Sequence, residues 1–150
     1  MSIHAEPSAE RVDGSFVPRY DLTETEMIYH TSKLLLEKTP QSADKIICFK
    51  VEADSDYANV ARSVEREVFE RYFGNNAAQM EEEYSPYETQ SRFFLSIDQE
   101  TGRPAGVLRV IENGPAGLKT INDLETMNQS ADRSLPHIST EDIMTAHSID

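Results

Sequence analysis

Apolar positions along this chain recur with two different periods, and the periods separate helices from strands. The first helical stripe consists of Met27, Ile28, Thr31, Leu34 and Leu35. Thr23 and Glu26 stand three residues apart and form a capping box that predicts a helix start at about Glu24. Since Pro40 cannot continue a helix, we expect this amphipathic helix to end near Lys38.

A compact apolar run follows from Lys45 to Val51. The run is rich in branched residues and too short for an average helix, so we interpret it as a largely buried strand. It contains Cys48, the only cysteine of the chain, which excludes an intrachain disulfide. A lone thiol among apolar neighbours predicts a small buried hydrophobic side chain rather than a nucleophile.

The strongest helical pattern lies between Tyr57 and Phe73. Its apolar members, spaced three or four residues apart, are Tyr57, Val60, Ala61, Val64, Val68 and Tyr72. The charged residues opposite or beside this stripe are Arg62, Glu65, Arg66 and Glu70. The polar cluster at 54–56 can cap the start of this helix, and Gly74 supplies its C-terminal stop.

An acidic and aromatic connector, residues 75–90, separates this helix from a predicted hairpin. Pro86 makes one continuous helix through the connector unfavourable, so we expect a short helix followed by an irregular segment. Apolar residues at 93–97 and 105–111 flank a turn-forming stretch, which is typical of two antiparallel strands. Gly106 inside the second strand indicates a bulge or a close backbone approach.

The two ends of the chain carry weaker patterns. Residues 1–20 are polar and lack periodicity, which predicts a flexible leader. Thr120 can start a short helix, and after Gln129 the pattern decays to at most one more helical turn near Thr140. We therefore predict one domain over residues 21–150, of α/β (α+β) class with a mainly antiparallel sheet and flanking helices.

Composition narrows the classes of function. The chain has 14 Lys and Arg against 27 Asp and Glu, and the net charge of -13 disfavours nucleic acid and anionic membranes as partners. No targeting or membrane-spanning segment is recognisable, so a cytoplasmic location is expected. The four histidines lie far apart in the sequence and have no Cys partner, so the sequence gives no support for a metal site. It also contains no serine-nucleophile motif, so hydrolase chemistry is not indicated.

The order strand, helix, acidic connector and hairpin resembles the N-terminal half of the Gcn5-related N-acetyltransferase superfamily. The local motifs are most similar to its acyl-homoserine-lactone (autoinducer) synthase branch, and the resemblance covers about Lys45 to Leu124. The motifs that carry the resemblance are Val68-Phe69, Pro86-Tyr87-Glu88, Phe93-Phe94-Leu95 and Gly106-x-x-Arg109.

This resemblance implies a cleft lined by an arginine and a phenylalanine of the helix, carboxylates of the connector, and the arginine of the G-x-x-R strand. Phe69, Glu88 and Arg109 match best, and Arg66, three residues before Phe69 where the family usually has four, is the candidate for the helix arginine. It also implies an acyl-CoA donor, such as acetyl-CoA, and an amine acceptor. Because no glycine-rich turn for a pyrophosphate occurs in the chain, we expect the C-terminal cofactor-binding half to be missing.

Several side chains are candidates for the chemistry. We expect Arg109 to form a bidentate pair with Glu88 that orders the cleft wall, the alternative being a solvated arginine at a strand end. The run Glu81, Glu82 and Glu83 could supply a general base for deprotonating an amine, the alternative being a solvated helix face. The candidate catalytic carboxylates are Glu83 from this run and Glu88 from the end of the connector. Tyr84 and Tyr87 could bind an acyl chain or adenine, although covering the core is the favoured role.

Two functions follow from these patterns. The first is an N-acyltransferase-like protein that transfers an acyl group from an acyl-CoA-type donor to an amine, incomplete or inactive as given. The second is a non-catalytic module that binds a small molecule or a protein and self-associates, as a homodimer, through an open sheet edge.

Overall fold

The computed structural model describes residues 16–38, 43–132 and 134–148. The described chain divides into two compact units, one ending at Val110 and the other beginning at Ile111. Residues 1–15 of the predicted leader and Pro40, the predicted helix stop, lie outside the described residues. The mixture of helices with an antiparallel sheet confirms the α+β class.

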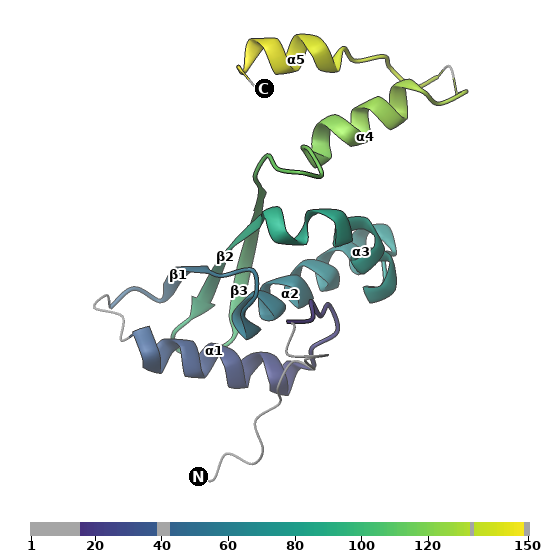
Figure 1. Ribbon diagram of the computed structural model, residues 1–150. Helices are drawn as coiled ribbons and strands as arrows, with labels where there is room; N and C mark the ends of the chain where they lie inside the picture. Colours follow the sequence, from purple (N-terminus) through teal and green to yellow (C-terminus); the bar gives the residue numbers. More distant parts are fainter. Residues whose placement is uncertain (1–15, 39–42, 133, 149–150) are drawn as a thin grey trace. The chain divides into compact units, whose positions relative to one another are not determined.

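The first unit carries the sheet and most of the helices (Figure 1). Its elements are α1 (Glu24–Lys38), β1 (Ile46–Val51), α2 (Asp56–Phe73), α3 (Ala77–Tyr84), the 3-10 helix η1 (Ser85–Gln90), β2 (Ser91–Asp98) and β3 (Pro104–Ile111). The last residue of β3, Ile111, is the first residue of the second unit. The predicted capping box of α1 is confirmed, because Thr23 Oγ1 accepts the Glu26 N–H at 3.2 Å and Glu26 Oε1 accepts the Thr23 N–H at 3.2 Å.

The second unit contains α4 (Lys119–Asn128) and α5 (Thr140–Ala146), which match the two weak helical signals of the sequence. Within these two helices, only Ile121 is buried. No helix in the described parts of the chain is long and apolar enough to cross a membrane.

The three strands form one antiparallel sheet in the order β1-β2-β3. Ile47 pairs with Ile97 and Phe49 with Leu95, so the inward side chains of β1 and β2 share one face. As an edge strand β1 is buried mainly along this face, and the prediction of a largely buried strand is wrong. Cys48 lies on the opposite face and is exposed, not buried as predicted.

Gly106 lies in β3 with open space at the position of a side chain. A Cβ atom added there would meet no heavy atom within 4 Å. The predicted close backbone approach at this glycine is therefore wrong.

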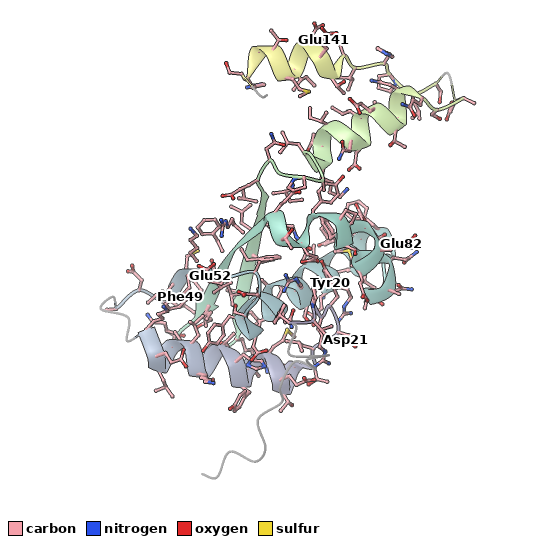
Figure 2. All side chains as sticks on the ribbon, viewed as in Figure 1. Tyr20, Asp21, Phe49, Glu52, Glu82 and Glu141 are labelled. Atoms are coloured by element: carbon pink, nitrogen blue, oxygen red, sulfur yellow. The ribbon has the colours of Figure 1, made fainter. Side chains whose placement is uncertain are left out.

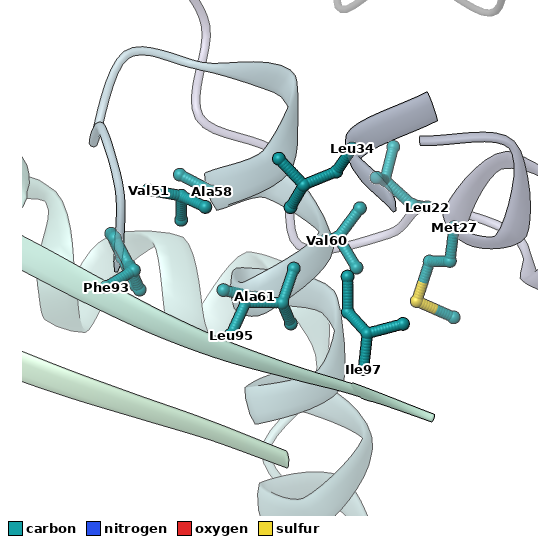
Figure 3. Packing of buried hydrophobic residues seen from close by; sticks show 10 residues of the cluster. All are labelled: Leu22, Met27, Leu34, Val51, Ala58, Val60, Ala61, Phe93, Leu95 and Ile97. Atoms are coloured by element: carbon teal, nitrogen blue, oxygen red, sulfur yellow. The ribbon is translucent and has the colours of Figure 1, made fainter. Parts of the chain in front are cut away.

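The core of the first unit joins α1 and α2 to the inner face of the sheet. Its buried members are Leu22, Met27, Leu34, Val51, Ala58, Val60, Ala61, Phe93, Leu95 and Ile97. Figure 3 shows the side chains of α2 between those of β2 and those of α1. This packing holds α2 in place, and α2 carries half of the charged cluster described below.

Helix α2 has both predicted caps but a different buried surface. Ser55 Oγ accepts the Ala58 N–H at 3.2 Å, and Gly74 ends the helix in the left-handed region at a φ of 76°. Its first half is buried on nearly all sides, so the charged Arg62 is buried with the apolar residues. Tyr72, assigned to the apolar stripe, is exposed.

The segment before α1, residues 16–22, is bound along α2. The N–H of Arg19 donates to Asn59 Oδ1 at 2.9 Å, and Asn59 Nδ2 donates to the carbonyl of Val17 at 3.2 Å. The Leu22 N–H donates to Ser63 Oγ at 3.1 Å. Residues 16–20, predicted as part of a flexible leader, therefore belong to the folded unit.

Candidate functional site

A buried cluster of charged side chains lies where α2, η1 and β3 meet. Arg62 and Glu65 come from α2, Glu88 from η1, and Arg109 from β3. All four side chains are at most 12% exposed, so each charge needs a partner inside the protein. The described residues supply these partners, since no buried side-chain nitrogen or oxygen among them is left without a hydrogen bond.

Arg62 is the most deeply buried charge, at 1% exposure. Its Nε and Nη2 donate to Glu88 Oε2 at 2.9 and 2.7 Å. Nη1 donates to Asn59 Oδ1 at 2.9 Å, and Nη2 also donates to the carbonyl of Ala53 at 2.8 Å. The guanidinium carbon lies 4.8 Å from the centre of the Phe93 ring, so an aromatic face covers the group. Arg62 thus joins three segments of the chain.

Arg109 forms its bidentate pair with Glu65, not with Glu88 as predicted. Its Nη2 donates to Glu65 Oε1 at 2.9 Å and its Nε to Glu65 Oε2 at 3.2 Å. Glu88 approaches Arg109 only to 3.7 Å, and its close partner is Arg62. The ring of Tyr84 covers Arg109, with its centre 3.9 Å from the guanidinium carbon.

Tyr20, which Figure 2 labels, lies in the segment that precedes α1 and joins the two ion pairs. Its hydroxyl accepts from Arg109 Nη2 at 2.7 Å and donates to Glu88 Oε1. Its backbone carbonyl accepts from Arg66 Nε at 3.0 Å. The phenol therefore connects the two carboxylate–guanidinium pairs into one network.

Burial and pairing act in opposite directions on the ionisable groups of this network. Burial raises the pKa of the Glu65 carboxyl, and the nearby charge of Arg109 opposes that rise. Burial alone would lower the pKa of Arg109, but Glu65, Tyr20 and Glu88 outweigh it and raise the pKa above its ordinary value. The guanidinium therefore stays charged.

The pKa of Tyr20 predicts how stability depends on alkaline pH. Burial raises this pKa above its ordinary value of 10.0, and the negative charge of Glu88 adds to the rise while Arg109 opposes it. The folded protein thus keeps a proton that unfolded chains lose above pH 10, so stability falls as pH rises through that range. We expect a loss of about 1.4 kcal/mol per pH unit, measured by urea unfolding.

Tyr20→Phe should abolish this alkaline slope, although it lowers stability at neutral pH by removing two hydrogen bonds. Tyr29→Phe is the matched control, because Tyr29 lies on α1 outside this network and its substitution should leave the slope unchanged. Equal alkaline slopes in wild type and Tyr20→Phe would contradict the assignment.

The pairing of Arg109 can be measured by double-mutant cycles. Arg109→Met combined with Glu65→Gln should show a coupling energy toward the upper end of the roughly 0.5–3 kcal/mol found for contacting residues. Arg109→Met combined with Glu88→Gln should show a smaller one, since that separation is 3.7 Å. A larger coupling energy for the Arg109–Glu88 cycle than for the Arg109–Glu65 cycle, both measured by urea unfolding, would show that Glu88 is the main partner.

A cleft of about 550 Å³ opens beside the Arg62–Glu88 pair, a volume in the usual range for small-molecule sites. Its lining residues are Phe16, Pro18, Ala53, Asp54, Arg62, Glu81, Ser85, Glu88 and Thr89. Three of these residues are acidic and one is basic, and the guanidinium of that one, Arg62, is already bound to Glu88, Asn59 and Ala53. The wall therefore combines an apolar surface with negative charge.

The other residues suggested by the sequence lie outside this lining. Glu83 is exposed on α3, and Glu81 is the member of that acidic run that faces the cleft. Phe69 packs against Phe73, with ring centres 5.5 Å apart, and Arg66 pairs with Glu70 on the same helix. Tyr87 is buried, as the favoured role of covering the core requires.

Sequence reasoning missed Arg62, Glu65 and Tyr20 as members of the site. The two α2 residues stand three apart, which places them on adjacent turns, and this spacing was the only local signal. Tyr20 carried no signal, because its contacts come from residues far along the chain.

The sequence matches no known family model and no curated protein, and the fold matches no solved structure. Fold and site together define a mixed α+β protein with a buried charge network beside an acidic cleft. Among the described residues, no group of three or more His, Cys, Asp or Glu side chains gathers as a metal site would require.

Proposed function

We propose that the first unit binds the amine acceptor of an N-acyltransferase reaction, with an acyl-CoA such as acetyl-CoA as the donor. The observation that carries the proposal is the acidic and partly apolar cleft beside Glu88 and Arg62. The resemblance of the connector and hairpin to acyltransferases gives the reaction class.

The composition of the cleft favours an ammonium group attached to an apolar chain. Asp54 and Glu81 attract a positive charge, and the apolar wall formed by Phe16 and Pro18 accommodates a hydrocarbon. An anionic acceptor would meet repulsion from the same carboxylates. An amine with a short alkyl chain is therefore the class of ligand that suits this wall.

Acyl transfer requires the amine to lose a proton before its nitrogen attacks the thioester carbonyl. Glu81 lies at the cleft and is exposed, so it is the base we propose in place of Glu83. Both carboxylate oxygens of Glu88 are hydrogen-bonded, one to Arg62 and the other to Tyr20. We therefore assign Glu88 a structural role in fixing the wall of the cleft. The carbon–sulfur bond of the thioester breaks, and the departing thiolate takes up a proton.

Calorimetric titration with three probes of equal length tests the amine preference. Hexylamine should bind more tightly than hexanol, and hexanoate should bind most weakly. Glu81→Gln should weaken hexylamine binding, whereas Glu82→Gln is the matched control because Glu82 is exposed on α3 and does not line the cleft (Figure 2). Tighter binding of hexanoate, or binding of none of the probes, would refute the proposal.

Thiol release from acetyl-CoA in the presence of hexylamine tests the catalytic part separately. Release that depends on Glu81 would support transfer by this chain. Binding of hexylamine without release is the result expected both of an acceptor half that needs a separate donor site and of the second candidate, a non-catalytic binding module. That candidate is supported by the sheet, in which β1 and β3 are both edge strands within the first unit.

A further inference from the structure

The last two turns of α2 carry an apolar surface that the core does not use. Val68, Tyr72 and Phe73 are 46%, 69% and 72% exposed. Phe69 lies beside them, with its ring centre 5.5 Å from that of Phe73. We name these four residues the α2 patch. Neighbouring exposed apolar side chains of this size are typical of interaction surfaces.

Charged residues accompany the α2 patch along one flank. Val68 and Tyr72 are one turn apart and share a face of the helix. Glu67 and Arg71, also one turn apart and both exposed, lie along one side of that face. On the other side lie the rings of Phe69 and Phe73. The flanks thus differ, one being charged and the other aromatic.

We propose that a second copy of this chain docks on the α2 patch, with the two α2 helices antiparallel about a twofold axis. In that arrangement each flank faces the same flank of the second helix, so acidic Glu67 lies opposite Arg71 of the other copy. The twofold axis repeats the contact, which gives two ion pairs. A parallel pair would instead place the charged flank against the aromatic one.

The interface of this dimer differs from the open sheet edge considered above. It covers Val68 and Tyr72, and neither residue lines the cleft that Glu81 and Ser85 line. The inference is therefore independent of the proposed acyl transfer. It depends on the self-complementary charge of one helix flank and the exposed apolar residues beside it.

Sedimentation equilibrium of the full chain tests the dimer. We expect wild type to be dimeric and Tyr72→Glu to be monomeric. Leu36→Glu is the matched control, because Leu36 is 79% exposed on α1, away from the α2 patch, and this variant should remain dimeric. A wild-type monomer at all concentrations would overturn the proposal. The proposal would also be overturned if Ile46→Glu on β1 dissociated the dimer and Tyr72→Glu did not.

A charge exchange tests the antiparallel arrangement. Glu67→Arg and Arg71→Glu should each raise the dimer Kd roughly tenfold, since two attractive contacts become repulsive. An equimolar mixture of the two variants should form a heterodimer, because opposite charges then face each other at both contacts. Failure of the mixture to associate better than either variant alone would overturn the arrangement.

Discussion

Arg62→Ala is expected to lower the free energy of unfolding by about 3–5 kcal/mol, a typical cost for removing one partner of a buried ion pair. The substitution leaves Glu88 without its nearest cation and removes the N–H donors that bind Asn59 Oδ1 and the carbonyl of Ala53. It also opens space against the Phe93 ring. Urea unfolding monitored by circular dichroism measures the change.

Arg103→Ala provides the matched control for this loss. Arg103 also pairs with a glutamate, Glu24, at 2.6 Å, but both side chains are about 60% exposed. Exposed pairs of this kind contribute about 0–1 kcal/mol. Similar losses in the two variants would mean that the buried network does not stabilise the fold.

Phe93→Ala is expected to cost about 3–5 kcal/mol, as large-to-small substitutions in a core do. Phe93 is fully buried in the core of the first unit. Its ring also contacts two cations, with the guanidinium carbons of Arg62 and Arg109 at 4.8 and 4.7 Å from the ring centre. The variant therefore loses apolar burial and the aromatic cover of both guanidinium groups.

Phe94→Ala removes the same side chain from the next residue and serves as the control. Phe94 belongs to the opposite face of the sheet, where it pairs with Lys50 of β1 and is half-buried. Its loss should cost about 1 kcal/mol or less in the same unfolding experiment. Equal costs at the two positions would contradict the assignment of the core face.

The helices of the first unit were predictable because their signals are local. The capping box at Thr23 and Glu26 and the stop at Gly74 both act within a few residues of the helix ends they define. The hairpin was predictable for the same reason, since its two strands flank a short turn that ends near Gly102. No partner distant in sequence was needed to recognise these elements.

Burial was harder to predict, because it depends on which elements cover a residue. The apolar run that contains Cys48 forms an edge strand, so alternate side chains are exposed. On α2, Arg62 and Glu65 are buried because the segment before α1 and the connector cover this side of the helix. From the sequence alone, charged residues on a helix are expected to face solvent. The periodicity of apolar residues identifies one buried face of a helix. It cannot show that other segments of the chain also cover a polar face of the same helix.

The pairing inside the charged cluster was equally dependent on distant contacts. The sequence contains two arginines and two glutamates that meet there, and spacing alone allows either glutamate to bind Arg109. The placement of η1 decides between them, because it brings Glu88 to Arg62 and leaves Glu65 to Arg109. Glu88 and Arg109 both lie in the cluster, but each pairs with another residue and not with its expected partner.

The most direct test of the proposed acceptor site is a titration of the isotope-labelled chain with hexylamine, followed by amide NMR. We expect the largest shifts at residues that line the cleft, such as Ala53, Glu81, Ser85 and Thr89, and a loss of these shifts in Glu81→Gln. Shifts confined to α4 and α5, or the absence of any saturable shift, would contradict an amine-binding cleft in the first unit.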